Sequence, residues 1–257
     1  MSVVPAKAIL RVDELVKTYG GVRAVDGVSF TVERGSITGL IGPNGAGKST
    51  VLGVISGFLA PTSGHIWFDG EDISGKPMHR IARKGLVRTF QMARVFGGLT
   101  ALENLLVSVP NQRGESALGI VGGSWYWRAQ ERELLEHARE LFNRFGLEGK
   151  EDEYGRNLSG GQKRAVEIMR ALMMKPRMLL LDEPMAGLSP ALSLQLERTF
   201  VRLAEEGLTL LIVEHELDTV DRICGKVIVM SQGRVLSEGR MSELRTRKEV
   251  QDAYVIG

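Results

Sequence analysis

One glycine-rich run has the residue types and spacing that phosphate binding requires. The run Gly42-Pro43-Asn44-Gly45-Ala46-Gly47-Lys48-Ser49 matches the pattern GxxxxGK[ST] and stands between an expected strand and an expected helix. Backbone N–H groups of such a loop can point at phosphate oxygens, helped by the dipole of the following helix. Lys48 is expected to reach the β- and γ-phosphates of ATP, and the Ser49 hydroxyl to ligate Mg²⁺. The predicted nucleotide contacts are Gly42, Pro43, Asn44, Gly45, Ala46, Gly47, Lys48, Ser49 and Thr50.

An acidic pair forms a second candidate site. The apolar run Met178–Leu181 has the length of a strand, and Asp182 and Glu183 follow it directly. Alone, such a pair is usually a solvated strand end. Because a phosphate loop lies upstream, we expect Asp182 to hold the Mg²⁺ shell and Glu183 to be the catalytic base that orients and deprotonates the attacking water.

The run Leu158-Ser159-Gly160-Gly161-Gln162 is the most specific of the motifs. A serine and two glycines at a helix N-terminus can form a further anion site. With the phosphate loop before it and the acidic pair after it, this run makes the chain resemble the ABC ATPase family. The resemblance implies that Ser159, Gly160, Gly161 and Gln162 contact the γ-phosphate of ATP bound by an opposite subunit, in a head-to-tail dimer that sandwiches two ATP molecules.

The same resemblance implies roles for three single residues. Gln91 would be catalytic and contact both Mg²⁺ and the water, His215 would be catalytic at the γ-phosphate, and Tyr19 would stack on adenine. An ordinary surface glutamine, a structural histidine and a strand-end tyrosine packed on its neighbours are the alternatives. The sequence departs from the family pattern at Ser189, where aspartate usually stands. This departure puts the coupling between two sites in doubt, not ATPase activity.

Shorter runs narrow the resemblance to the ATP-binding subunits of branched-chain amino acid importers. They are Val87–Gln91, Arg94–Phe96 with Leu99 and Thr100, Glu103-Asn104, Val213–Glu216 and Ala253-Tyr254. Similar subunits serve the uptake of urea, short amides or other amino acids, so the solute stays open. The resemblance implies a second ATP-binding subunit, identical or related, and separate transmembrane permease subunits as partners, with a solute-binding protein as an indirect one.

Two other classes of ABC ATPase share the ATP motifs. A DNA-repair or chromosome-associated ATPase needs a long coiled coil between the phosphate loop and the Ser159 motif, and that interval shows no sustained heptads. A ribosome-acting factor carries two cassettes and a basic linker in one chain. With 33 basic and 31 acidic residues and a single set of motifs, the chain fits neither class, and no nucleic-acid partner is expected.

The sequence also predicts where the protein works. A single cysteine, Cys224, suits a reducing compartment. Charged residues interrupt the N-terminal segment early, and no run approaches the ~20 apolar residues that a spanning helix needs. We therefore expect a cytoplasmic protein, peripheral on the inner face of the cell membrane.

Periodicity indicates the elements that position these motifs. Alternating runs at Ile9–Tyr19, Val22–Val32 and Gly64–Gly70 predict antiparallel strands, and Ser36–Ile41 predicts a strand that enters the phosphate loop. Helices are expected from Lys48 to about Phe58 and over Glu131–Phe145. After residue 160, expected helices and strands alternate, which favours a parallel sheet covered by helices. They are a helix to about Met174, a strand at Met178–Leu181, a helix near Leu192–Glu205 and a strand at Leu208–Val213.

The predicted fold class is α/β: a P-loop (RecA-like) core with an N-terminal antiparallel β layer and an inserted α-helical subdomain. Residues 1–257 would form one ABC ATPase domain, with 1–90 and 159–257 in the core and 91–158 in the helical subdomain. In the family, the groove beside Gln91 receives short helices of the membrane subunits. A docking surface of Met92, Val95, Phe96 and Leu99 is therefore expected, unless Phe96 and Leu99 pack inside the subdomain.

Overall fold

The computed structural model describes residues 8–89, 95–110 and 124–255. Contacts divide the chain into two units, one of residues 1–91, 177–186 and 200–257 and the other of residues 92–176 and 187–199. The boundary expected between residues 158 and 159 falls inside the second unit, because the helix that begins at Gly160 packs with the helices before it.

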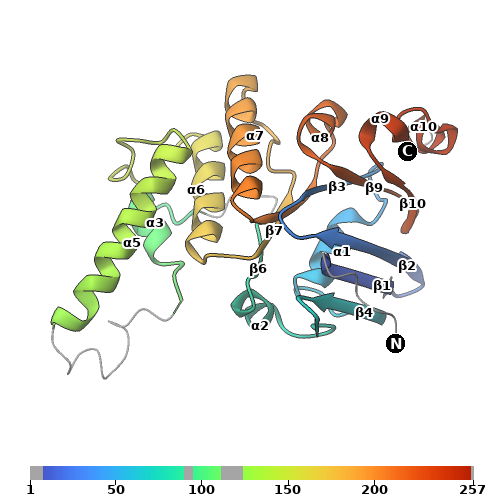
Figure 1. Cartoon of the computed structure of the whole chain (residues 1–257), viewed down its shortest axis with the longest axis horizontal. Coiled ribbons are helices and arrows are strands. Elements are labelled where there is room, and N and C mark those ends of the chain that lie inside the picture. The colour runs from blue at the N-terminus through green and yellow to red at the C-terminus, as the bar shows by residue number, and fades with distance from the viewer. Residues whose placement is uncertain (1–7, 90–94, 111–123, 256–257) are drawn as a thin grey trace. The chain divides into compact units, whose positions relative to one another are not determined.

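The first unit is built on a six-stranded sheet with strand order β10-β9-β3-β8-β7-β6 (Figure 1). All neighbouring pairs are parallel except β10 with β9. Every residue of β3, β7 and β8 is buried, as expected of central parallel strands covered on both faces. The strands are β3 Ile37–Ile41, β6 Leu86–Arg88, β7 Met178–Asp182, β8 Thr209–Val213, β9 Lys226–Ser231 and β10 Arg234–Gly239.

A four-stranded antiparallel sheet forms the N-terminal β layer, in the order β2-β1-β4-β5. It contains β1 Ala8–Tyr19, β2 Val22–Glu33, β4 Ser63–Phe68 and β5 Glu71–Asp72. Tight turns join β1 to β2 and β4 to β5. Gly20 and Gly70 adopt φ values of 56° and 80°, the left-handed region that favours glycine in tight hairpins. The alternating runs therefore predicted this antiparallel layer correctly.

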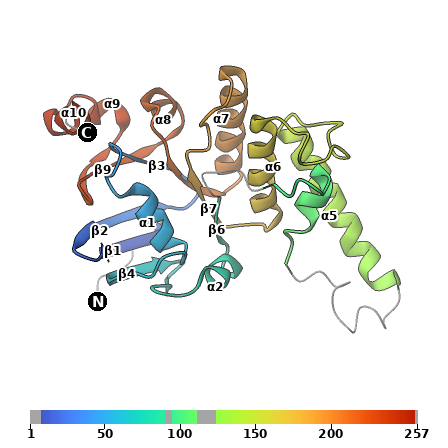
Figure 2. The same cartoon turned by 180° about the vertical axis from the view of Figure 1, so that it is seen from behind.

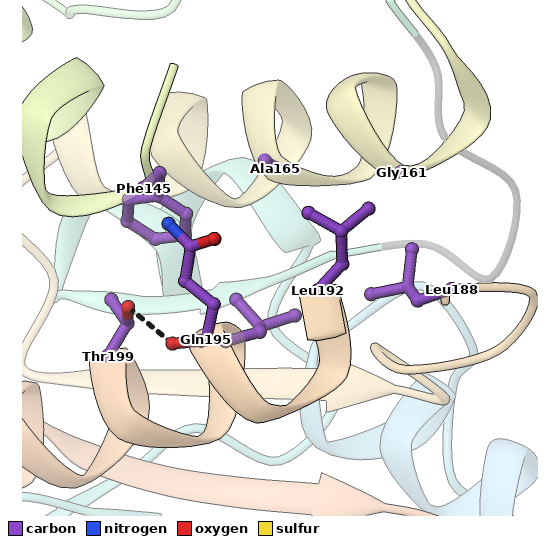
Figure 3. Close-up of a pocket in the computed structure, with 8 residues that line it drawn as sticks. Phe145, Gly161, Ala165, Leu188, Leu192, Gln195 and Thr199 are labelled. Carbon is purple, nitrogen blue, oxygen red and sulfur yellow. Dashed lines mark hydrogen bonds between the residues drawn. The ribbon is translucent and has the colours of Figure 1, made fainter. Parts of the chain in front are cut away.

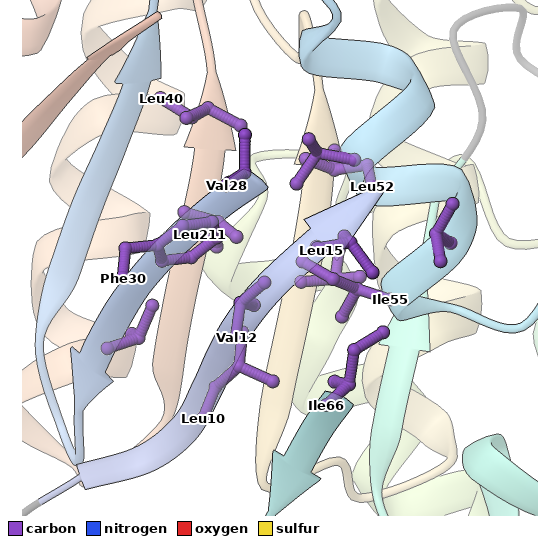
Figure 4. Close-up of a cluster of buried hydrophobic side chains, with 14 of the residues drawn as sticks. Leu10, Val12, Leu15, Val28, Phe30, Leu40, Leu52, Ile55, Ile66 and Leu211 are labelled. Atoms are coloured by element: carbon purple, nitrogen blue, oxygen red, sulfur yellow. The ribbon is translucent and has the colours of Figure 1, made fainter. Parts of the chain in front are cut away.

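Helix α1, Lys48–Ile55, contributes to a hydrophobic core shared with both sheets of the first unit. Figure 4 shows Leu52 and Ile55 beside Leu15 and Ile66 of the antiparallel layer, with Leu211 of β8 in the same cluster. Because this helix is anchored by fully buried side chains, the loop at its N-terminus is held at a fixed place beside β3.

Helix α1 ends earlier than expected. Gly57 takes a φ of 71°, and the N–H groups of Phe58 and Leu59 both turn back to the carbonyl oxygen of Gly53 at 3.0 Å. A glycine in this conformation ends a helix, so Phe58 lies outside it and is 60% exposed.

A second cluster of buried side chains in the first unit joins the sheet to the C-terminal helices, and Figure 2 shows these helices from behind. Ile41 and Val229 of the sheet pack with Val220, Leu244 and Val250. Helix α2 spans Met78–Arg83, and the C-terminal helices are α8 Leu217–Ile223, α9 Met241–Leu244 and α10 Lys248–Val255.

The second unit is helical, as the sequence predicts. It contains α3 Ala101–Leu106, α5 Ser124–Arg144, α6 Gly160–Met173 and the first ten residues of α7 Pro190–Glu205. Helix α5 begins seven residues before the expected Glu131, so it includes Trp125, Tyr126 and Trp127. Within the described ranges, no helix combines the length and the apolar character that crossing a membrane would demand.

Candidate functional site

The glycine-rich loop connects β3 to α1 and approaches other backbone closely. Gly47 has a φ of 98°, and a side chain there would place its Cβ 2.5 Å from the carbonyl oxygen of Ala24. Lys48 is buried, and its Nζ donates to the carbonyl oxygens of Gly42 at 2.7 Å and Pro43 at 2.9 Å. Burial lowers the pKa of Lys48, and the charges of Glu183 and Asp182 oppose that shift.

Parallel strands bring the acidic pair to the same edge of the sheet as this loop. Leu40 of β3 and Asp182 of β7 both pair with Val213 of β8, so the three strands end side by side. The hydroxyl of Ser49 lies 3.4 Å from Oδ1 of Asp182, while Nη2 of Arg88 donates to Oδ2 at 2.9 Å. The structure therefore brings together Ser49 and Asp182, two of the three predicted Mg²⁺ ligands.

Glu183 and His215 form a direct pair. Nε2 of His215 lies 2.7 Å from Oε1 of Glu183, and the two side chains are 41% and 19% exposed. Glu183 also has a φ of 49°, a left-handed conformation that is uncommon for a residue with a side chain and is concentrated at functional sites. A carboxylate held this way beside an imidazole can accept a proton from a water molecule.

Tyr19 ends β1 at the hairpin and is 47% exposed. It pairs with Val22, two residues before the Ala24 carbonyl that approaches Gly47. The ammonium of Lys17 lies 5.0 Å from the centre of the Tyr19 ring. The ring is thus accessible in the same part of the first unit as the loop.

The Ser159 motif caps α6 in the second unit. Ser159 Oγ accepts from the N–H of Gln162 at 3.3 Å, and Gln162 Oε1 accepts from the N–H of Ser159 at 2.9 Å, a reciprocal capping box. Ser159 and Gly160 are exposed, whereas Leu158 is buried. The motif therefore presents an ordered helix N-terminus at the surface of its unit.

Gly161 allows α6 to approach the start of α7. A Cβ at this position would lie 2.8 Å from Cδ1 of Leu192 and 3.2 Å from Cδ2 of Leu188. The two helices line a small, mainly apolar pocket, shown in Figure 3, into which Gln195 also points. Ser189 occupies the turn before α7, where its Oγ accepts from the N–H of Leu192 at 3.4 Å. The serine at this departure from the family pattern thus helps to begin a helix.

Sequence reasoning did not give a role to two charged residues that the structure places beside these groups. Arg88 pairs with Asp182, and the carboxylate of Glu214, which is 3% exposed, accepts backbone N–H groups of Met185 and His215. Arg88 and Glu214 each belong to a run that was noted only for its resemblance to the importer subunits. A charged residue at the end of an otherwise apolar strand is the signal that could have identified them. Gln91 lies outside the described residues.

The donor set suits a nucleotide phosphate with Mg²⁺. The loop lies at the N-terminus of α1, Lys48 supplies a cation, and Ser49 and Asp182 supply the hydroxyl and carboxylate oxygens that Mg²⁺ prefers. A side chain at Gly47 would clash with Ala24, so the close packing of the loop depends on glycine. These features define a P-loop nucleotide site.

Comparisons with known proteins identify the family. The sequence profile described as ABC transporter matches residues 25–186. A probable branched-chain amino acid transport ATP-binding protein, LivG of Archaeoglobus fulgidus, is 39% identical over 247 residues, which cover 96% of this chain and 95% of the relative. BraF of Pseudomonas aeruginosa, named as a high-affinity branched-chain amino acid transport ATP-binding protein, is 39% identical over 251 residues, 97% and 98% of the two chains. The chain therefore belongs to the ABC transporter family and is an ATP-binding cassette with ATPase activity.

A third relative is named for a different role. The lipopolysaccharide export system ATP-binding protein LptB of Escherichia coli is 36% identical over 248 residues, 96% of this chain and 97% of the relative. Export was not among the alternatives that the sequence suggested.

Solved structures confirm the predicted fold class. A nucleotide-free ATP-binding cassette from an ABC transporter is 37% identical, with a TM-score of 0.83 over 96% of this chain and 98% of that one. A dimeric cassette in a post-hydrolysis state, bound to ADP and Pi, is 26% identical, with a TM-score of 0.74 over 90% and 98% of the two chains.

Proposed function

We propose that this chain is the ATP-hydrolysing subunit of an importer for branched-chain amino acids and drives separate membrane subunits. The observation that carries the catalytic part is the convergence of Lys48, the Ser49–Asp182 pair and the Glu183–His215 pair at the carboxyl ends of adjacent parallel strands. The relatives named as branched-chain amino acid transport proteins support the solute.

Each residue at this edge has a distinct part in hydrolysis. Lys48 leaves the loop carbonyls to contact the β- and γ-phosphates, and Ser49 and Asp182 would hold Mg²⁺. Mg²⁺ held there would neutralise part of the charge that develops on the phosphates. Glu183 takes the proton of the attacking water, and His215 orients Glu183 through their 2.7 Å contact. Gln91 would complete the metal and water contacts.

A second cassette completes the site. Ser159, Gly160, Gly161 and Gln162 contact the γ-phosphate of ATP bound to the partner, a second cassette that is identical or related to this chain. The exposed, capped N-terminus of α6 and the dimeric cassette among the similar structures support this assignment. Tyr19 stacks on the adenine ring from its exposed position at the end of β1.

Membrane subunits give the protein its place in the cell. As a cassette without a spanning helix in its described residues, the chain would work in the cytoplasm against the inner face of the membrane, held by transmembrane permease subunits. A solute-binding protein would contact those subunits and not this chain. Urea, amides or other amino acids are alternative solutes, and the likeness to LptB favours lipopolysaccharide export as a second candidate function.

Substitution of the proposed base tests the catalytic assignment. Glu183→Gln is expected to keep ATP binding but to lose roughly 10²- to 10⁴-fold in hydrolysis, the usual contribution of general base catalysis. ATP that is bound but not cleaved should hold two subunits together, so size-exclusion chromatography with and without ATP should show a dimer only with ATP. Full activity, or a monomer at saturating ATP, contradicts the proposal.

The solute is tested separately. The chain is co-expressed with the permease subunits and the solute-binding protein of a branched-chain amino acid importer, and uptake of labelled leucine is compared with uptake of urea. Leucine uptake that disappears with Lys48→Ala supports the importer. Defects of the outer membrane in cells that lack the protein, without any change in uptake, would instead support export.

A further inference from the structure

We propose that Glu214 is a positioning residue for catalysis, which ties the turn carrying Glu183 to the backbone of His215. This inference rests on the proposed function, because Glu183 is the base there. Glu214 follows β8 directly and is 3% exposed, although it carries a carboxylate. A buried carboxylate is unfavourable unless its oxygens accept hydrogen bonds, so its partners indicate what it does.

The two oxygens of Glu214 reach two different segments. Oε1 accepts from the backbone N–H of Met185 at 2.9 Å, and Oε2 accepts from the backbone N–H of His215 at 3.3 Å. Met185 lies two residues after Glu183, and His215 is the residue that contacts Glu183 through its ring. The carboxylate therefore links the backbones on both sides of the Glu183–His215 pair.

The turn after Glu183 needs such a tie. Glu183 holds a left-handed φ of 49°, and its N–H donates to the carbonyl oxygen of Val213 at 3.0 Å. The N–H of Ala186 then turns back to the carbonyl oxygen of Glu183 at 3.2 Å. An uncommon backbone conformation persists only where surrounding contacts fix it. In this turn, the hydrogen bond from the Met185 N–H to the charged carboxylate of Glu214 is such a contact.

Charge and shape both favour glutamate at this position. A carboxylate offers two acceptor oxygens and no donor, which matches two N–H groups. Glutamine would keep the shape but turn an amide NH₂ toward one of these donors. Burial raises the pKa of Glu214, and the two backbone N–H groups oppose that shift. The carboxylate of Glu214 is thus buried, despite the cost in free energy, at the place where it holds the turn.

The test compares Glu214→Gln with Glu216→Gln, which changes an exposed carboxylate two residues further on. Glu214→Gln is expected to lower kcat by about 10- to 100-fold while the Kd for ATP stays within about twofold, since a small displacement of a catalytic group lowers the rate of the chemical step more than binding. Hydrogen exchange of the Met185 amide, followed by mass spectrometry of short peptides, should become faster. Glu216→Gln should change none of these quantities.

Several results would overturn the proposal. One is an unchanged kcat in folded Glu214→Gln, and another is a fall in melting temperature without a fall in kcat. A third needs no variant: in the wild-type protein the Met185 amide must exchange slowly, and exchange at the rate of an unstructured amide would show that the tie is absent.

Glu183→Gln is measured alongside to separate the two proposals. If that variant keeps its activity, the base assignment fails. If it loses activity while Glu214→Gln keeps it, only the role of Glu214 fails.

Discussion

Arg88 and Asp182 form a buried ion pair at the ends of two neighbouring strands. Nη2 of Arg88 lies 2.9 Å from Oδ2 of Asp182, and the side chains are 9% and 2% exposed. Gly53 of α1 keeps room for the guanidinium, because a Cβ at that position would lie 3.3 Å from Nη1 of Arg88. One carboxylate oxygen thus faces Arg88 while the other faces Ser49.

Substitution of Arg88 should show how much this ion pair contributes to the free energy of unfolding. Arg88→Gln leaves a buried carboxylate without its cation, which is expected to lower the free energy of unfolding by about 3 to 5 kcal/mol. Urea denaturation measures the change, and Arg80→Gln on the exposed side of α2 should stay within about 0.5 kcal/mol of wild type. The double variant Arg88→Met, Asp182→Leu should be more stable than Arg88→Gln. Equal stability of wild type and Arg88→Gln would show that the pair contributes nothing.

The Arg88–Asp182 pair also shows which contacts could not be predicted from the sequence. The phosphate loop and Asp182 were placed correctly at strand ends because local apolar runs predict strands, and parallel strands align their ends. Arg88 precedes Asp182 by 94 positions, and its contact depends on β6 pairing with β7, which no local pattern encodes. The role of Glu214 was missed for the same reason, since its partner Met185 lies on another segment.

The end of α1 and the start of α5 also differ from the boundaries that the sequence predicts. Gly57 carries the signal that ends α1, yet the apolar Phe58 beyond it made the pattern seem to continue. At α5, Trp125, Tyr126 and Trp127 have weaker helix propensity than leucine or alanine, so the sequence did not predict that the helix starts at Ser124.

Replacement of the loop lysine tests nucleotide binding. Lys48→Ala is expected to abolish ATP binding in titration calorimetry, because the cation that should move from the loop carbonyls to the phosphates is gone. Lys248→Ala, at an exposed position on α10, is the matched control and should bind as wild type does. An unchanged Kd for Lys48→Ala would contradict the assignment of the loop.

Alkaline pH should weaken the fold through Cys224. Its Sγ lies near Gly39, the side chain packs against the cluster that contains Val220, and burial raises the pKa of the thiol from 9.0 to about 12. A raised folded-state pKa means that the stabilising contribution is complete below about pH 9 and is lost as the pH rises through about 12.

The alanine variant isolates this contribution. Cys224→Ala should be less stable than wild type at pH 8, because it loses packed volume, and the deficit should shrink between pH 9 and 12. Chemical denaturation at a series of pH values measures both proteins. A deficit that is constant over that range would show that the folded thiol titrates as it does in the unfolded chain.

Phe96 offers a test of docking to the membrane subunits. Its side chain is 51% exposed, with the Arg170 guanidinium 4.8 Å from the ring centre, so it is not fully packed inside the second unit. Its backbone is held independently, because Asn104, which is fully buried, accepts from the Phe96 N–H at 2.8 Å and donates to the Phe96 carbonyl oxygen at 3.0 Å. The side chain can therefore change while the segment keeps its place.

Phe96→Asp should separate docking from folding. An exposed cation–π contact contributes only about 0.5 to 1 kcal/mol, so the variant is expected to melt cooperatively and to keep its basal ATPase activity within about threefold of wild type. A charge on an apolar docking surface should nevertheless prevent co-purification with the membrane subunits and stop uptake. Val107→Asp, at another exposed apolar position of the same unit, is the matched control and should assemble normally. Loss of the cooperative transition in Phe96→Asp would make Phe96 a core residue, and normal assembly would remove it from the docking surface.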